Sequence, residues 1–170
     1  MSLSMYQASV PVYLQYLKSI SAVLDKGAAF AEAKKIDPAL LLAARLYPDM
    51  HPLTKQVQIF TDQATRGVSR LAGVEPPPFP DTETNFAELK ARIQKAIAHV
   101  ESFKPAQIDG SEEREIVMKT PRGDLTFKGR DYLLGFSLPN FFFHATATYA
   151  ILRHVGVEIG KMDFIGGAPR

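Results

Sequence analysis

The chain has 170 residues, of which 46% are hydrophobic and 22% are charged, and its formal net charge is +2 at pH 7. This length and composition predict one globular domain over residues 1–170, with enough chain to bury a substantial core. The small net charge, with lysine and arginine spread along the sequence, gives no electrostatic reason to expect a nucleic acid or an anionic membrane as a partner. The lack of cysteine excludes disulfides, thiolate nucleophiles and cysteine zinc sites.

Two features of the sequence bear on location. The opening residues lack a basic region followed by a long apolar run, so no signal peptide is visible. The sequence also contains no uninterrupted run of about 18 apolar residues, so no transmembrane helix is expected. Together with the missing cysteines, these features fit a cytoplasmic protein.

Apolar residues at helical spacing predict a long first helix. Ser4 is a suitable N-cap for this helix, and its apolar stripe runs from Val10 to Leu24. Gly27 is expected to end or bend the helix, because glycine is common where helices stop. Residues 28–35 would then form a short continuation.

A second group of helices is predicted from Asp37-Pro38 onward. An aspartate followed by proline is typical of a helix start, and we expect a short helix over residues 39–46. A second long helix should begin at about Pro52. Its apolar residues recur every three to four positions, and Gly73 is its expected end.

The next segment is rich in proline. Residues 75–81 contain four prolines and are predicted to form an extended, stiff connection. Thr84 or Asn85 can cap the third long helix, which should end before Pro105. This connection is long enough to serve as the crossover of a helical bundle.

The residue preferences then change from helix-forming to strand-forming. Residues 115–120 and 124–128 are separated by Pro121-Arg122-Gly123 and predict a β-hairpin. A fourth long helix should cover residues 130–155, with Pro139 kinking or dividing it. Four long helices, one crossover and one hairpin predict an all-α four-helix bundle with a short β-hairpin inserted before the last long helix.

The last helix carries the most informative polar pair. Asn140 and His144 are four residues apart, so they lie on one helix face, one turn apart. They could share a metal ion, or His144 could act as a general base that its neighbour orients. The alternative is a buried polar pair that satisfies itself by a mutual hydrogen bond.

Three further residues are candidates for the same pocket. Gln56 and Asp49 could supply polar groups at its mouth, and Tyr149 could add a hydroxyl one turn beyond His144. Each also has a purely structural interpretation. Asp49 would interact with a helix N-terminus, Gln56 would be solvated, and Tyr149 would be an aromatic core residue whose hydroxyl reaches the rim.

Three successive phenylalanines suggest an interface. Phe141, Phe142 and Phe143 span about 200° of a helix, so they cannot all face one core. At least one must line a pocket, meet the hairpin or contact a second subunit. This geometry leads us to expect a homodimer.

The chain resembles the DinB-like superfamily, and more closely one of its uncharacterised bacterial subfamilies, known only as a domain of unknown function. The resemblance spans nearly the whole sequence. It rests on several short segments read together: Ser4-Met5-Tyr6, Pro48-Asp49-Met50, Gln56-Val57-Gln58, Pro139-Asn140-Phe141-Phe142-Phe143-His144, Tyr149-Ala150-Ile151-Leu152-Arg153-His154 and Gly160-Lys161-Met162-Asp163-Phe164.

The resemblance implies a four-helix bundle, commonly dimeric, with a pocket between the helices. Many members carry three histidines that bind a divalent metal such as nickel, zinc or manganese, and some look like metal-dependent thiol S-transferases. His144 falls where the second of two paired histidines is expected, and His51 could play the ligand of the second helix. Asn140 stands where the first paired histidine belongs, and its carbonyl oxygen is a weaker and harder ligand than imidazole.

The sequence and the resemblance together therefore suggest three alternative functions. The leading one is small-molecule binding in a pocket around Asn140, His144, Gln56 and Tyr149. The second is a divalent-metal-dependent thiol S-transferase in which His51, Asn140 and His144 hold the ion. The third is a stress-related dimer without catalytic activity.

Overall fold

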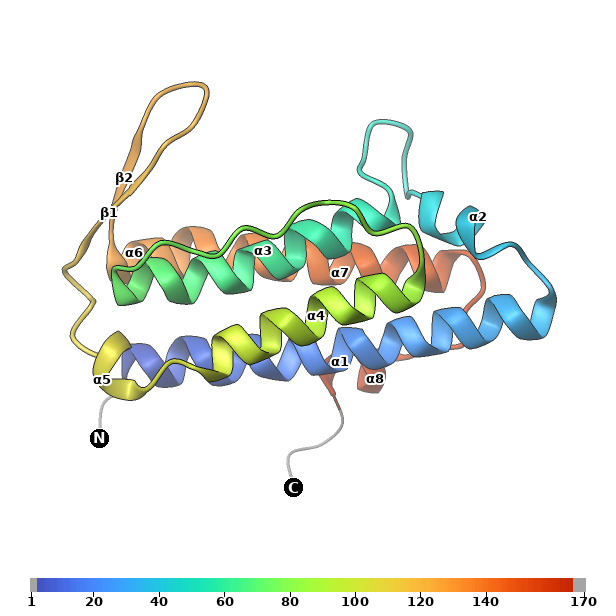
Figure 1. The fold of residues 1–170 in the computed structure, drawn as a ribbon, viewed down its shortest axis with the longest axis horizontal. Coiled ribbons are helices and arrows are strands. Elements are labelled where there is room, and N and C mark those ends of the chain that lie inside the picture. The colour runs from blue at the N-terminus through green and yellow to red at the C-terminus, as the bar shows by residue number, and fades with distance from the viewer. Residues whose placement is uncertain (1–2, 167–170) are drawn as a thin grey trace.

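The computed structural model describes residues 3–166, and four long helices lie side by side in it (Figure 1). They are α1 (Met5–Lys34), α3 (Leu53–Ala72), α4 (Phe86–Glu101) and α7 (Leu138–His154). Shorter elements join or extend them: α2 (Pro38–Ala43), α5 (Pro105–Ile108), β1 (Glu115–Met118), β2 (Leu125–Lys128), α6 (Gly129–Tyr132), the π-helical segment η1 (Leu133–Ser137) and α8 (Lys161–Ile165). The predicted four-helix bundle with a hairpin before the last long helix is confirmed.

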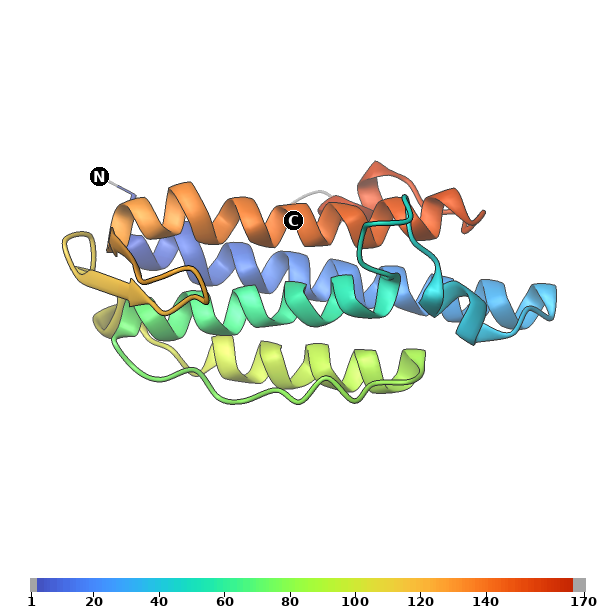
Figure 2. The ribbon, with the colours of Figure 1, turned by 90° about the horizontal axis from the view of Figure 1, so that it is seen from above.

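The order of the helices explains the long crossover. α3 and α4 run in the same direction, opposite to α1 and α7 (Figures 1 and 2). Because parallel neighbours cannot be joined by a tight turn, the chain between them must travel back along the bundle. The proline-rich segment does this as an extended strand of chain beside α3 and α4, as its composition predicted.

Capping residues fix the helix ends where the sequence placed them. Ser4 caps α1 by accepting a hydrogen bond from the Gln7 backbone, and the Gln7 side chain accepts one from the Ser4 backbone in return. Asn85 caps α4 by accepting a hydrogen bond from the Glu88 backbone. Gly73 ends α3 at a φ of 72°, in the left-handed region that glycine adopts without strain.

Gly27 has a different role from the expected one. It lies inside α1, which continues to Lys34 without interruption. A Cβ atom at this position would lie 3.0 Å from Leu152 Cδ2 and 3.2 Å from Phe86 Cε1. The glycine therefore lets α7 and α4 approach α1 closely, and the prediction that it ends or bends the helix is wrong.

The short helix α2 ends earlier than expected, at Ala43 instead of residue 46. Ala44 is already extended, and the chain then forms the loop 44–52, which stands out from the bundle. The Arg45 guanidinium donates hydrogen bonds to the carbonyls of Pro48 and Met50 and closes this loop on itself. These bonds replace the last helical turn that the apolar pattern had suggested.

The proline in the last helix is absorbed without a break. Residues 133–137 widen into a π turn directly before α7, and Pro139 follows at the start of α7. Proline has no backbone N–H and clashes with the carbonyl four residues earlier, and a π turn relieves both problems by adding one residue. α6, η1 and α7 consequently follow one another along a single axis (Figure 2).

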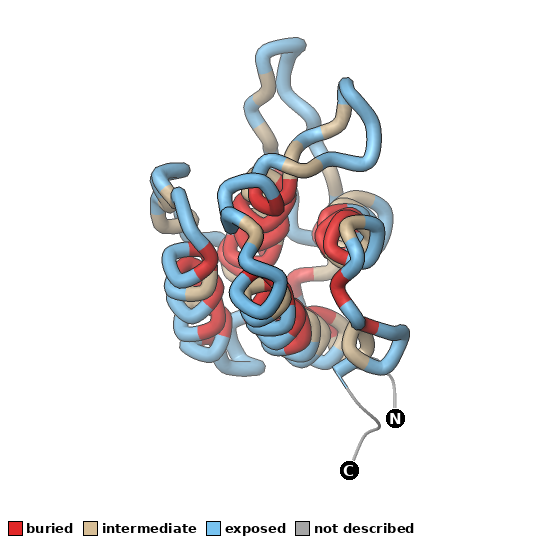
Figure 3. The backbone as a smooth tube through the Cα atoms, turned by 90° about the vertical axis from the view of Figure 1, so that its right-hand side faces the viewer, coloured by how far each residue is buried: buried red, intermediate tan, exposed pale blue. Residues whose placement is uncertain are grey.

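The core lies where the four long helices face one another (Figure 3). Phe141 is fully buried at its centre, stacked on Phe60 at a centroid distance of 4.5 Å and set edge-on to Tyr13 at 4.9 Å. Phe142 is half-buried against Tyr16, and Phe143 is 57% exposed. The three phenylalanines therefore point to three environments, as their spacing required.

The hairpin projects from one end of the bundle (Figure 1). β1 and β2 pair antiparallel, with Glu115 opposite Lys128 and Met118 opposite Leu125. The two strands confirm the predicted hairpin, although each is shorter than the run that predicted it. Within residues 3–166, no helix is both long and apolar enough to cross a membrane.

Candidate functional site

His144 and Gln56 form the centre of the candidate site. His144 projects from α7 toward α3, and its Nδ1 lies 2.7 Å from Gln56 Oε1. The Gln56 amide nitrogen donates to the backbone carbonyl of His51, which fixes its oxygen as the acceptor for His144. His144 Nδ1 therefore carries the proton, and Nε2 keeps a free lone pair.

The environment keeps this imidazole neutral. His144 is 9% exposed, and burial lowers its pKa to about 4, with a further lowering from the nearby charge of His51. Nε2 makes no hydrogen bond with the described residues and is not among their fully buried polar atoms. The site thus presents one unprotonated nitrogen that can accept a hydrogen bond at neutral pH.

Asn140 does not bond to His144. Its amide nitrogen donates to the Phe136 carbonyl at 3.0 Å, one turn back along the same helix. This carbonyl belongs to the π turn before Pro139, where the regular backbone ladder is disturbed. The Asn140 amide nitrogen therefore bonds to the backbone of its own helix. Gln56, and not Asn140, is the hydrogen-bond partner of His144.

Two other predicted pocket residues lie apart from His144. Asp49 is exposed on the loop 44–52, and its carboxylate makes no hydrogen bond or ion pair with residues 3–166. Tyr149 faces α8, where its ring packs on Phe164 at a centroid distance of 5.7 Å and its hydroxyl donates to the Ile159 carbonyl at 3.5 Å. The packing of α8 on this side of α7 could not be anticipated from the spacing of Tyr149 and His144.

An apolar groove lies between α7 and the loop 44–52, and it reaches His144 through Phe143, whereas His144 and Gln56 are not among the residues that line it. Its volume is about 370 Å³. Phe143 forms one wall and also meets the His144 ring edge-on at 5.2 Å, and Met50 in the opposite wall directly precedes His51. The groove is lined by Leu46, Met50, Phe142, Phe143, Thr146, Ala147 and Ala150.

The donor set falls short of a strong metal site. In the part of the chain that the structure describes, no three side chains of the His, Cys, Asp or Glu types come close enough together to hold a metal ion. His144 and His51 are neighbours, and the Asn140 amide nitrogen bonds to Phe136, so Asn140 could offer only its carbonyl oxygen, a weaker ligand than imidazole. Catalytic zinc usually needs three good ligands and an open position, so these residues fit a metal poorly.

A second polar cluster, which the sequence did not predict, is centred on Arg92 in α4. Arg92 is 2% exposed and binds Thr61 and Asp62 of α3 as well as the crossover segment. One signal was present, because Arg92 lies three residues after Leu89 and directly before Ile93, on the apolar stripe of its helix. A charged residue in that position requires buried partners.

His99 also has a role that its sequence position did not indicate. Its Nε2 lies 2.8 Å from the Ser69 hydroxyl, which connects α4 to α3, and burial lowers the pKa of His99. Ser69 is completely buried. Its hydroxyl cannot meet a substrate there, so the pair serves as a polar contact between two helices.

Comparison with known proteins identifies the family. A family model described as a domain of unknown function, DUF1993, matches residues 5–165. The chain belongs to this family. A crystal structure of a DinB family member protein from Shewanella denitrificans shares 39% sequence identity with this DUF1993 chain and superimposes with a TM-score of 0.89, covering 97% of this chain and 93% of that one. No curated protein matches.

Proposed function

We propose that this DUF1993 protein binds an apolar small molecule that carries one hydrogen-bond donor. The molecule would lie in the groove between α7 and the loop 44–52, with its donor directed at His144 Nε2. The observation that carries the proposal is the 2.7 Å contact between His144 Nδ1 and Gln56 Oε1, which leaves His144 Nε2 without a partner among the described residues. An apolar cleft with a single placed polar group is the usual form of a small-molecule site.

The shape and chemistry of the groove favour a flat aromatic ligand. Ala147 and Ala150 give it a floor of small side chains, and Phe143 supplies an aromatic wall. Two fused rings fit within a volume of about 370 Å³. Because neutral His144 accepts at Nε2, the ligand should donate, so a hydroxyl is a better match than an ether or a carboxylate.

Three matched naphthalenes test the proposal. Binding of 1-naphthol, 1-methoxynaphthalene and naphthalene would be measured by isothermal titration calorimetry at pH 7. We expect 1-naphthol to bind about 2–10-fold more tightly than the other two, since one net hydrogen bond contributes about 0.5–1.5 kcal/mol. His144→Leu should abolish this preference, and Phe143→Ala should weaken binding of all three.

Two results would contradict the proposal. Equal affinity for the three compounds would show that His144 Nε2 does not contact the ligand. Failure of all three to bind would reject the groove as a site for ligands of this size. His154→Leu, at an exposed position in the last turn of the same helix, is the matched control and should change nothing.

A second candidate is the metal-dependent thiol S-transferase. It is favoured by one observation, because metal-ligating histidines usually donate their other N–H to a carbonyl oxygen, as His144 does to Gln56. Elemental analysis of untagged protein, dialysed with nickel, zinc or manganese, decides between the two. We expect less than one equivalent of bound metal. One equivalent that disappears in His144→Ala would favour the transferase.

The homodimer is also a proposal. Phe143 of α7 is 57% exposed and Leu46 of the loop 44–52 is 38% exposed, and both line the groove, so burying them against a second copy would remove apolar surface from water. Multi-angle light scattering at micromolar concentration should then give twice the mass of the chain, and Phe143→Glu should halve it. A monomer in the parent protein would contradict the dimer and leave the groove open to a small ligand.

A further inference from the structure

The proline-rich crossover, residues 74–84 and here called the strap, is held to the bundle in an unusual way. No residue between Gly73 and Asn85 is buried. At its start the Val74 backbone donates to the Ser69 carbonyl, but residues 75–84 make no backbone–backbone hydrogen bond with the described part of the chain. Neither apolar burial nor a backbone ladder therefore fixes the strap in place.

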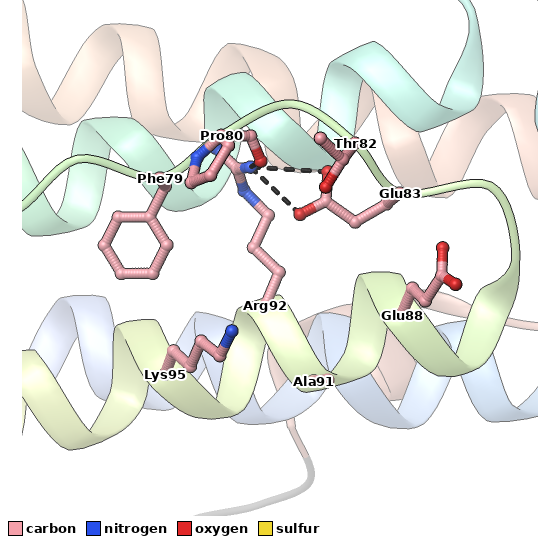
Figure 4. Close-up of a pocket in the computed structure, with 8 residues that line it drawn as sticks. All are labelled: Phe79, Pro80, Thr82, Glu83, Glu88, Ala91, Arg92 and Lys95. Atoms are coloured by element: carbon pink, nitrogen blue, oxygen red, sulfur yellow. Dashed lines mark hydrogen bonds and ion pairs between the residues drawn. The ribbon is translucent and has the colours of Figure 1, made fainter.

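One buried guanidinium supplies most of the attachment. Arg92 reaches from α4 to the strap, where it donates to the Pro80 carbonyl at 3.0 Å and to Glu83 at 3.1 Å (Figure 4). It also forms an ion pair with Asp81 at 3.1 Å, and it lies over the Phe79 ring at 5.5 Å from the centroid. Four strap residues between positions 79 and 83 thus contact a single side chain.

The other guanidinium nitrogens of Arg92 bind side chains of α3. Nε donates to the Thr61 hydroxyl at 2.7 Å, and Nη2 binds Asp62 at 2.7 Å. Two further contacts join the strap to α3. Lys55 pairs with Asp81 at 2.5 Å with both side chains 37% exposed, and an exposed pair of this kind contributes little to stability. The amide of Gln58, which is buried, donates to Glu83 at 2.9 Å.

The surface beneath the strap is polar and loosely filled. Gln58, Thr61 and Asp62 lie there on α3, and exposing such groups to water carries a small cost compared with exposing an apolar core. A cavity of about 170 Å³ separates the strap from α4. A well-packed interface would leave no such space.

We infer that the strap is a releasable cover, which detaches as a unit from α3 and α4 while the four helices stay folded. Arg92 is the side chain that keeps it closed. Release exposes the polar row of α3 and frees the Arg92 guanidinium. This behaviour follows from the separation of roles in the structure, because the apolar core holds the helices and a polar cluster alone holds the strap.

A single tryptophan on the strap makes this measurable. The sequence contains no tryptophan, so Phe79→Trp places the only indole beside Arg92. Acrylamide quenching of its fluorescence reports strap exposure, and far-ultraviolet circular dichroism reports the helices. During a urea titration we expect the quenching constant to rise at least about twofold before any helicity is lost. Coincident transitions would overturn the proposal.

Variants then identify the attachment point. In the Phe79→Trp background, Arg92→Met should raise the quenching constant without urea, while Lys95→Met should not. Lys95 borders the same cavity and makes no ion pair with the described residues, so it is the matched control. Because Arg92→Met removes the buried ion-pair partner of Asp62, leaves it with the half-exposed Arg66 and could prevent folding, the double variant Asp81→Asn with Glu83→Gln provides a second test.

The double variant removes the two strap carboxylates that pair with Arg92 and leaves Arg92 with Thr61 and Asp62 inside the bundle. We expect it to raise the quenching constant with unchanged helicity, though by less than Arg92→Met, because the contacts of Arg92 with the Pro80 carbonyl and the ring at position 79 remain. An unchanged quenching constant in the double variant would show that the ion pairs of Arg92 do not hold the strap closed, and it would overturn the proposal whether or not Arg92→Met folds.

Discussion

Replacing Phe141 with alanine is expected to lower the free energy of unfolding by about 3–5 kcal/mol. Phe141 is fully buried, with Phe60 stacked on one face of its ring and Tyr13 and Tyr16 set edge-on to it. Alanine would leave a cavity that the packed helices α1 and α3 cannot close. Urea denaturation followed by circular dichroism measures the loss.

Phe143→Ala is the matched control for this prediction. The residue type and the helix are the same, but Phe143 is 57% exposed, so its truncation should change stability by less than about 1 kcal/mol. A large loss in Phe143→Ala, or a small one in Phe141→Ala, would show that α7 is rotated from the position described above.

Acid should destabilise the protein through His144. Its pKa is lowered from 6.5 to about 4 by burial and by His51, so the folded state binds fewer protons than the unfolded state between these values. Stability is therefore expected to fall as the pH drops from about 6.5 to about 4, and this histidine contributes no further change below that range. After allowance for partial solvent screening, the loss is about 1–3 kcal/mol.

Urea denaturation at several pH values between 4.5 and 7 measures this effect. His144→Gln keeps a neutral donor for Gln56 and should flatten the pH dependence. Some slope should remain, because burial also lowers the pKa of His99. His154→Gln, at an exposed position, should retain the full slope. An unchanged slope in His144→Gln would contradict the lowered pKa.

Local signals in the sequence were sufficient to predict the fold. Ser4, Asn85 and Gly73 act through atoms within a few residues, so their effect on helix ends can be inferred without tertiary structure. Gly27 could not be interpreted in this way. A glycine is needed at this position because Leu152 and Phe86 approach it from other helices, and no local sequence pattern reveals that approach.

The candidate site was only partly predictable for the same reason. Gln56 and His144 were both proposed as pocket residues, but their direct hydrogen bond depends on the alignment of α3 with α7. Asn140 lies on the same helix as His144, yet the π turn before Pro139 gives its amide a closer partner in Phe136. From the sequence alone, a polar side chain that bonds to the backbone cannot be distinguished from one that contacts a ligand.

The position of Phe141 also has a consequence for synthesis of the chain. The core closes only when α7 packs against both Tyr13 of α1 and Phe60 of α3. Both of these helices leave the ribosome long before α7 is synthesised, so their apolar faces stay without their final packing partner until then. The nascent chain therefore passes through a stage in which helices exist but the core is open, and chaperones that bind apolar helix faces would act during that interval.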